Sequence, residues 1–166
     1  ATRTENTVTI NQPAEKVHKA FTTQEYWAYI AEHLSPEPGE VNEFNQADGG
    51  AAVTLFEVLP LEVLPEAVRA MISQALKVKR VINVSALADG AASIDYNADV
   101  KGTPVDFKGT IGLAGDDVST TLVYNNEVSV NIPFMGPAIE PKVGDALGEL
   151  YNNEGALTEK WIAENL

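Results

Sequence analysis

The chain of 166 residues contains no cysteine. A disulfide scaffold, a thiolate metal site and a cysteine nucleophile are therefore excluded, and this lack fits a reducing compartment. Positive charge is also scarce, because 11 Lys and Arg stand against 24 Asp and Glu, for a formal net charge of −13 at pH 7. Binding to nucleic acid or to an anionic membrane surface depends on clustered Lys and Arg, so this balance argues against both partners.

Long apolar runs are missing as well. The richest stretch, residues 53–68, is interrupted by Pro60, Pro65 and three glutamates, and it falls short of the roughly eighteen apolar residues of a membrane-spanning helix. Residues 1–11 hold no apolar segment of signal-peptide length. The sequence thus predicts no membrane span and no export signal, and we expect a cytoplasmic protein.

The clearest pattern that is present lies in residues 137–166. Their apolar side chains recur at helical spacing and share one side of a predicted helix: Val143, Ala146, Leu147, Leu150, Leu157 and Trp161. Pro141 suits the first position of a helix, so the helix is predicted to begin there, with Ile139 in the preceding turn. This stripe needs a partner surface, and the strands predicted before it supply one.

Glycines on the flank of the stripe allow two interpretations. Gly144, Gly148 and Gly155 each cost about 1 kcal/mol of helix propensity relative to Ala, which indicates that another segment comes close there. Alternatively, residues 151–155 form a turn in which Gly155 caps a shorter helix. The apolar stripe keeps its phase across this segment, which favours a single continuous helix.

The remaining chain predicts mainly strands. Alternating apolar and polar residues indicate seven of them, at residues 4–11, 40–46, 51–59, 77–87, 92–101, 105–113 and 118–132. Asp48-Gly49 and Asp89-Gly90 predict hairpin turns. Two short helices are expected between Pro13 and Leu34, the second capped by Thr22 or Thr23.

A further helix is predicted to connect the third and fourth strands, with Pro65 in its first turn. Its apolar face consists of Val68, Met71, Ile72, Ala75 and Leu76. No linker, repeat or low-complexity tract divides the chain, so one domain is expected over residues 1–166.

Several short motifs accompany this order of elements. They are Pro13, Val17, His18, Ala20, Phe21, Tyr26 and Trp27 near the start, Leu64 and Pro65 before the connecting helix, Ile132, Pro133 and Gly136 before the last helix, and Glu154, Leu157, Thr158, Trp161 and Ile162 near the end. With them the chain resembles the START and Bet v 1-like (SRPBCC) superfamily, and within it most closely a bacterial family called domain of unknown function 2505.

The resemblance implies an α+β helix-grip fold. In this fold a seven-stranded antiparallel sheet curls around a long C-terminal helix, with two short helices after the first strand and one connecting helix. Most members of the superfamily bind apolar small molecules between the sheet and the final helix, some are cyclases and others bind proteins. The closer family supplies no activity to carry over.

Glu154 is the most unusual residue of the apolar stripe. An ionised carboxylate is costly there unless it is paired, solvated or neutralised. It either orients a ligand in a cavity, reaches solvent, or meets a partner in the core. Arg80 is a candidate partner, because strand alternation places it on the same face as Val78 and Ile82. A shift of one residue in strand register would send Arg80 to solvent instead.

The last predicted strand adds polar groups to an apolar face. Val118, Leu122, Tyr124, Val128 and Val130 share that face with Asn126, and Tyr96 supplies a hydroxyl from a neighbouring strand. Such groups either orient a ligand within apolar walls or are core residues with satisfied hydroxyls. The predicted ligand-binding set is Arg80, Tyr96, Tyr124, Asn126, Leu147, Leu150 and Glu154.

Other polar residues form no recognisable site. His18 and His33 are predicted to lie on the surface, and two histidines without a carboxylate cluster make no metal set. No catalytic or phosphate-binding motif occurs, and no cofactor is expected. Phe134 and Met135 either gate a pocket or pack under the start of the last helix as a hydrophobic staple does.

Three functions follow from these patterns. The first is a binding protein that holds an apolar or amphipathic small molecule between the sheet and the final helix. The second is a cyclase- or hydrolase-type enzyme with Glu154 or Tyr124 as acid or base, although no second titratable group is placed beside either residue. The third is an interaction protein with a filled core. A cavity of a few hundred cubic ångströms distinguishes the first function from the third.

Overall fold

A computed structural model describes residues 1–34, 38–59, 66–70 and 76–166. The strands are β1 Thr2–Ile10, β2 Glu40–Ala47, β3 Gly50–Leu59, β4 Leu76–Val84, β5 Ala91–Lys101, β6 Val105–Gly115 and β7 Thr120–Val130. The helices are α1 Ala14–Phe21, α2 Gln24–His33, α3 Glu66–Arg69 and α4 Gly136–Asn165. All seven predicted strands are confirmed, with ends that differ by a few residues.

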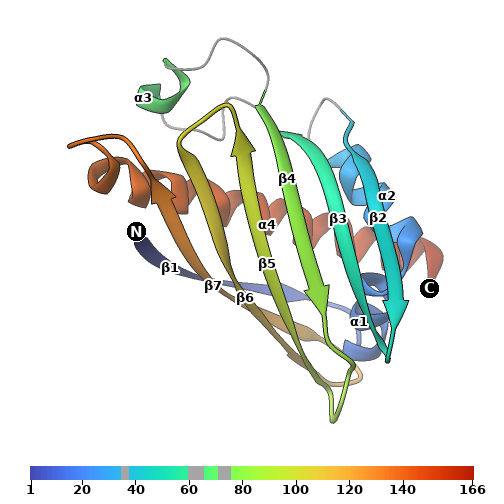
Figure 1. Ribbon diagram of the computed structural model, residues 1–166. Helices are drawn as coiled ribbons and strands as arrows, with labels where there is room; N and C mark the ends of the chain where they lie inside the picture. Colours follow the sequence, from blue (N-terminus) through green and yellow to red (C-terminus); the bar gives the residue numbers. More distant parts are fainter. Residues whose placement is uncertain (35–37, 60–65, 71–75) are drawn as a thin grey trace.

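The strands form one antiparallel sheet in the order β1-β7-β6-β5-β4-β3-β2. Figure 1 shows this sheet curling around α4, which runs along its inner side, with α1 and α2 near the carboxyl end of α4. This is the helix-grip arrangement that the sequence predicted. In the described part of the chain, no helix is both long and apolar enough to cross a membrane.

Turn chemistry sets the register of two hairpins. Asp48 and Gly49 both have positive φ angles, 54° and 78°, and Asp89 and Gly90 repeat this with 53° and 76°. Two consecutive residues with positive φ match the right-handed twist of the flanking strands, and Asp-Gly is a preferred pair for this conformation. Both predicted hairpin turns are therefore confirmed.

Helix α4 is continuous through residues 151–155, so the alternative of a turn at Gly155 is wrong. The predicted start at Pro141 is also wrong, because the helix begins at Gly136 and Pro141 lies inside it. Pro137 occupies the first turn instead, where its missing N–H removes no helical hydrogen bond. Pro141 is exposed and removes one such bond, a cost that the buried face of a 30-residue helix can offset.

The glycine flank of α4 lies against β1, as the cost of those glycines indicated. A Cβ atom on Gly144, Gly148 or Gly155 would lie 2.7, 2.6 or 2.6 Å from side-chain atoms of Thr4, Asn6 and Val8, respectively. These three β1 residues alternate along the strand and therefore share its inner face. The missing side chains allow strand and helix to approach closely.

The start of α4 is held by a carboxylate. Glu140 is buried and accepts hydrogen bonds from the Val130 backbone N–H at 3.0 Å and from the Thr2 hydroxyl at 2.8 Å. Phe134 is fully exposed and Met135 half exposed, so the predicted hydrophobic staple is wrong. Glu140 ties β1, β7 and α4 together, and the helix start needs no apolar contact from the loop before it.

Two short helices precede β2, as predicted. Thr23 is the N-cap residue of α2, but its hydroxyl donates to the Lys19 carbonyl of α1 and makes no capping bond. His18 is buried, with Nε2 2.8 Å from the Ser85 carbonyl oxygen, so its predicted surface position is wrong. The contact joins α1 to the end of β4. His33 is exposed, as predicted.

Two further predictions need correction. Leu76 begins β4, where it pairs with Leu59, and does not belong to the connecting helix. The described part of that helix is α3, and Pro65, Met71, Ile72 and Ala75 lie outside the described residues. Val118 is exposed and precedes β7, because its N–H and that of Ser119 donate to the Asp116 carboxylate in a turn. The face of β7 therefore starts at Thr120.

Candidate functional site

The buried carboxylate of Glu154 meets Arg80 across the space between sheet and helix. Arg80 faces inward because it alternates with buried Val78 and Ile82 on β4. Its Nη1 lies 3.0 Å from Oε2 and 3.4 Å from Oε1 of Glu154 on α4. The two residues are 8% and 6% exposed, so this is an ion pair inside the core.

A second carboxylate, Glu57 of β3, binds the same guanidinium. Arg80 Nη2 donates to Glu57 Oε2 at 3.4 Å, and Nε lies 2.8 Å from Glu57 Oε1. The Nε–H does not point along that short contact, so the buried Nε has no aligned acceptor in the described residues. Arg80 therefore stands between two buried carboxylates, and when all three groups are ionised the cluster carries one excess negative charge.

Burial and charge act in opposite directions on this cluster. Burial raises the pKa of Glu57, Arg80 lowers it, and the negative charge of Glu154 raises it further, so that the net pKa is raised. Burial alone would lower the pKa of Arg80, but the two carboxylates hold it well above its usual range. Arg80 consequently stays charged, and its guanidinium also lies 5.9 Å from the ring centroid of Trp27.

A chain of hydrogen bonds runs beside the cluster from α4 to the sheet. The Tyr151 hydroxyl lies 3.2 Å from both the Tyr96 hydroxyl and the Asn126 side-chain oxygen. The Asn126 amide donates to the side-chain oxygen of Asn6 on β1 at 2.9 Å. These hydrogen bonds pair the buried hydroxyl groups of Tyr96 and Tyr151. Burial raises the pKa of Tyr96 to about 12.

Tyr124 makes no side-chain hydrogen bond to the residues that the structure describes. Its ring stacks on Tyr151 with centroids 4.1 Å apart and planes 14° apart, which fixes its orientation. Burial, followed by the charge of Glu154, raises the pKa of its hydroxyl well above the usual range. The hydroxyl is therefore a neutral polar point on the wall of the space described next.

These groups border a small cavity between the sheet and α4. Its volume is about 20 Å³, room for one water molecule, which needs on the order of 10–15 Å³. The lining is mostly aromatic and aliphatic and consists of Phe21, Trp27, Arg80, Ile82, Ile94, Tyr96, Phe107, Ile111, Tyr124, Tyr151 and Glu154. The described residues thus enclose an aromatic pocket that is nearly closed.

Four residues of the predicted set line this cavity: Arg80, Tyr96, Tyr124 and Glu154. Asn126 reaches it only through its hydrogen bond to Tyr151, and Leu147 and Leu150 are buried beyond its walls. Whether any of the seven binds a ligand stays a prediction. Within the described ranges, no three His, Asp or Glu side chains converge in a way that could hold a metal ion.

Sequence reasoning missed Glu57 and Tyr151. Glu57 had a usable signal, because it alternates with the buried Val53 and Leu55 on β3 and so shares their inward face. Tyr151 was considered only as part of a possible turn, although in a continuous helix it lies beside Leu147 and Leu150. The sequence predicts Trp27 in a short helix, but no local pattern places its ring near Arg80.

Comparisons with known proteins agree on family and fold. Residues 5–162 match the model of the family described as "Protein of unknown function (DUF2505)". Uncharacterized proteins of Mycobacterium tuberculosis and Mycobacterium bovis are 26% identical over 159 residues, which covers 92% of this chain and 91% of theirs. The match spans most of both chains, and these relatives supply no activity.

Solved structures extend the likeness to the fold. A conserved protein from Geobacillus kaustophilus matches with a TM-score of 0.63 at 13% identity, covering 98% of this chain and 96% of that one. A START superfamily protein from Mycobacterium smegmatis gives 0.58 at 14%, covering 97% and 99%. Norcoclaurine synthase from Thalictrum flavum, in complex with dopamine and hydroxybenzaldehyde, gives 0.55 at 12%, covering 99% and 88%. At these identities the likeness concerns the fold alone.

Proposed function

The chain belongs to the family described as "Protein of unknown function (DUF2505)", and we propose that it is a small-molecule binding protein of the helix-grip fold. The ligand is an apolar or amphipathic molecule with an aromatic part, held between the sheet and α4. Its polar group is oriented by Arg80 and Tyr124. The fold is compatible with such a role, since norcoclaurine synthase was solved with two small aromatic compounds.

The observation that carries the proposal is the buried Glu57–Arg80–Glu154 cluster on the wall of an aromatic cavity. Well-packed apolar residues of similar volume are often as stabilising as a buried ion cluster, so folding alone does not require these charges. Among the described residues, no acceptor is aligned with the buried Arg80 Nε–H, and the Tyr124 side chain lines the cavity without a hydrogen bond to any of them. A few polar points among apolar walls are what orients a ligand in a pocket.

The cavity volume limits how such a ligand enters. A space of about 20 Å³ cannot hold an aromatic molecule, so side chains of the lining must move when it binds. The stacked rings of Tyr124 and Tyr151 are the walls with the largest area to displace. The apparent affinity is then reduced in proportion to the fraction of molecules in which these side chains have moved.

The same volume favours one competing function. A nearly closed core is what an interaction module with a filled interior has, and such a protein needs no ligand. An enzyme gains less support, because both carboxylates are engaged by Arg80 and neither is free to exchange protons with a substrate. Binding and interaction are therefore the two functions to separate.

Trp27 lines the cavity and can report binding directly. In a Trp161→Phe background it is the only tryptophan, since the chain has two. We expect native mass spectrometry of protein purified from its own cells to show a bound small molecule, and the extracted molecule to change Trp27 emission when added back. Tyr124→Phe should weaken this titration about tenfold without lowering the melting temperature, because it removes one unpaired hydroxyl.

Tyr29→Phe is the matched control, because Tyr29 sits on α2 and is not part of the cavity lining. It should leave the titration unchanged. If no small molecule is bound after purification, and a panel of aromatic amphiphiles leaves Trp27 emission unchanged, the binding proposal fails. The interaction module is then the better account.

A further inference from the structure

A groove of about 480 Å³ lies near the end of β3. Most of the strand residues that line it alternate with buried residues and therefore face away from α4. The groove is bordered by Glu40, Phe56, Val58, Lys77 and Lys101, among others. The last pair between β2 and β3 is Glu40 with Phe56, so β3 continues beyond the end of β2 at this place. The groove is distinct from the interior cavity, although Glu57 contributes to its wall.

Two like charges face each other in this groove. Lys77 of β4 and Lys101 of β5 are directly opposite in the strand register. Like charges at such positions destabilise a sheet, and this chain has only 11 Lys and Arg to distribute. In the part of the chain that the structure describes, neither ammonium lies within ion-pair distance of a carboxylate.

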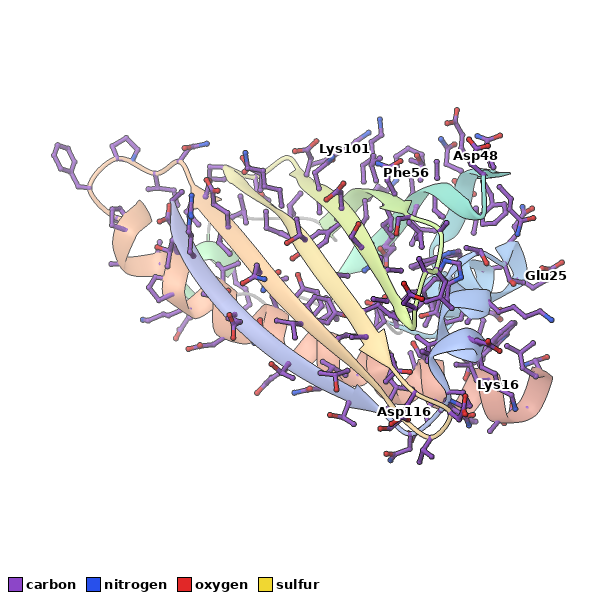
Figure 2. The ribbon with its side chains drawn as sticks, turned by 90° about the horizontal axis from the view of Figure 1, so that it is seen from below. Lys16, Glu25, Asp48, Phe56, Lys101 and Asp116 are labelled. Atoms are coloured by element: carbon purple, nitrogen blue, oxygen red, sulfur yellow. The ribbon has the colours of Figure 1, made fainter. Side chains whose placement is uncertain are left out.

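The Lys101 side chain is directed into the groove. Its Nζ lies 5.2 Å from the ring centroid of Phe56 on β3, so it extends across β4. Figure 2 shows Lys101 and Phe56 beside each other on the outer side of the sheet. A half-buried aromatic ring and two lysine side chains therefore line the same groove.

Neighbouring carboxylates offset only part of this positive charge. Lys79 pairs across the strands with Asp99, and Glu40 lies at the rim opposite Phe56 in the register. In the described strands, Lys77 stands between Lys101 and Val58 in the register, so neither of its cross-strand neighbours is a carboxylate. The part of the groove beside these two lysines therefore carries positive charge in a protein whose net charge is −13.

We propose that this groove binds a soluble small molecule that carries a phosphate or carboxylate group on an aromatic body. The acidic group lies between the ammonium groups of Lys77 and Lys101, which relieves their mutual repulsion, and the aromatic body lies on Phe56. Ammonium groups act as point charges for such oxyanions. The negative charge of the whole molecule disfavours an anionic membrane as the source of that group.

Isothermal titration calorimetry with 1-naphthyl phosphate and with 1-naphthoate tests the proposal. Wild-type protein should bind at least one of them, with an affinity that falls as salt is added. Neutral 1-naphthol and inorganic phosphate should each bind at least tenfold more weakly, because each offers only half of the recognised chemistry. Equal binding of 1-naphthol would show that the charge is not recognised and would overturn the proposal.

Variants locate the binding. The double variant Lys77→Gln/Lys101→Gln should lose at least tenfold in affinity and keep or slightly raise its melting temperature, since it removes a like-charge pair. Phe56→Leu should weaken the naphthyl compounds and leave inorganic phosphate unchanged. The matched control is Lys16→Gln/Lys19→Gln, which removes two exposed charges from α1, at the far end of the molecule from Lys101 in Figure 2.

Three results would overturn the proposal: equal losses in the groove variant and the α1 control, a lower melting temperature of the groove variant, or binding only to phosphatidic acid vesicles. Equal losses would indicate a general effect of protein charge. A lower melting temperature would mean that the two lysines stabilise the fold, and binding only to vesicles would mean that the recognised phosphate belongs to a membrane lipid. None of these measurements involves Trp27 or Tyr124. Because aromatic amphiphiles are also the proposed ligands of the interior cavity, only binding that Lys77→Gln/Lys101→Gln weakens counts for the groove, and the two failures are thereby distinguishable.

Discussion

Arg80 is held between two buried carboxylates, although one would balance its charge. The pKa of Glu57 is raised, first by burial and then by the charge of Glu154, against the opposing effect of Arg80. A raised pKa in the folded protein means that the folded state binds this proton more tightly than the unfolded state. Stability from this group is therefore full below pH 4.5, the ordinary value, and is lost as pH rises through the folded value.

Glu57→Gln should remove that pH dependence. The Gln side chain keeps an oxygen that accepts from Arg80 and leaves Arg80 and Glu154 as a one-to-one pair. Relative to wild type, the variant should therefore gain stability as pH rises from about 4.5 towards 7.5. Urea denaturation at several pH values measures this difference in the free energy of unfolding.

Glu43→Gln is the control for the loss of one negative charge, because Glu43 is exposed on β2. A difference between Glu57→Gln and wild type that stays constant with pH would contradict the raised pKa. A difference that shrinks with rising pH would mean that Arg80 outweighs burial at this site.

At the scale of elements, the contact between α4 and β1 depends on what the helix lacks. Gly155 is the critical position, because the atom opposite it is Cγ1 of Val8, a buried side chain with little rotamer freedom. Asn6 opposite Gly148 is longer and can turn aside more easily. The three glycines are thus unequal, and the cost of adding a methyl group should depend on the β1 residue opposite.

Gly155→Ala should destabilise the protein by about 1–3 kcal/mol. Alanine favours the helix by about 1 kcal/mol, but its Cβ would lie 2.6 Å from Val8 and force helix and strand apart. The free energy of unfolding from urea titration gives the result. Gly112→Ala on β6, where a new Cβ meets nothing within 4 Å, is the steric control and should be neutral or slightly stabilising. A higher free energy of unfolding for Gly155→Ala would show that β1 can move away from the new methyl group without destabilising the protein.

At the scale of the whole molecule, α4 joins segments from both ends of the chain. Its glycine flank meets β1, and Trp161 packs with its ring centroid 5.5 Å from Tyr26 of α2. Tyr26 also contacts Trp27 at 4.9 Å and bonds the Thr158 hydroxyl of α4 at 2.7 Å. These contacts leave no part of the described sheet with a core separate from that of the helix.

We therefore expect the chain to unfold in one cooperative step, as a single domain over residues 1–166. Far-ultraviolet circular dichroism reports the loss of helix and sheet, and fluorescence reports the surroundings of Trp27 and Trp161, which both contact Tyr26. The two measurements should give the same urea midpoint. Trp161→Ala should shift both midpoints together and cost about 3–5 kcal/mol. Separate midpoints would mean that α2 and α4 leave the sheet before it unfolds.

Local pattern alone determined most of the strands, turns and helices. The alternation of apolar residues predicted seven strands, the Asp-Gly pairs predicted two turns, and the 3.6-residue period predicted a continuous final helix. These signals act between residues close in sequence, so they can be read without coordinates. The start of α4 was misjudged because a carboxylate from within the helix, Glu140, bonds β7 and β1, and proline position alone does not show that bond.

In the candidate site, too, the sequence predicted some positions and the tertiary structure decided the contacts. Strand alternation put Arg80 on the inner face, and helical spacing put Glu154 on the apolar stripe. The sequence therefore predicted an inward position for both partners of the ion pair. Tertiary structure decided that they meet, that Glu57 joins them and that Tyr151 stacks on Tyr124. It also decided that the cavity holds about one water molecule. Contacts between residues far apart in the chain depend on how sheet and helix are packed, and cavity volume depends on every side chain at once, so neither has a local signature in the sequence.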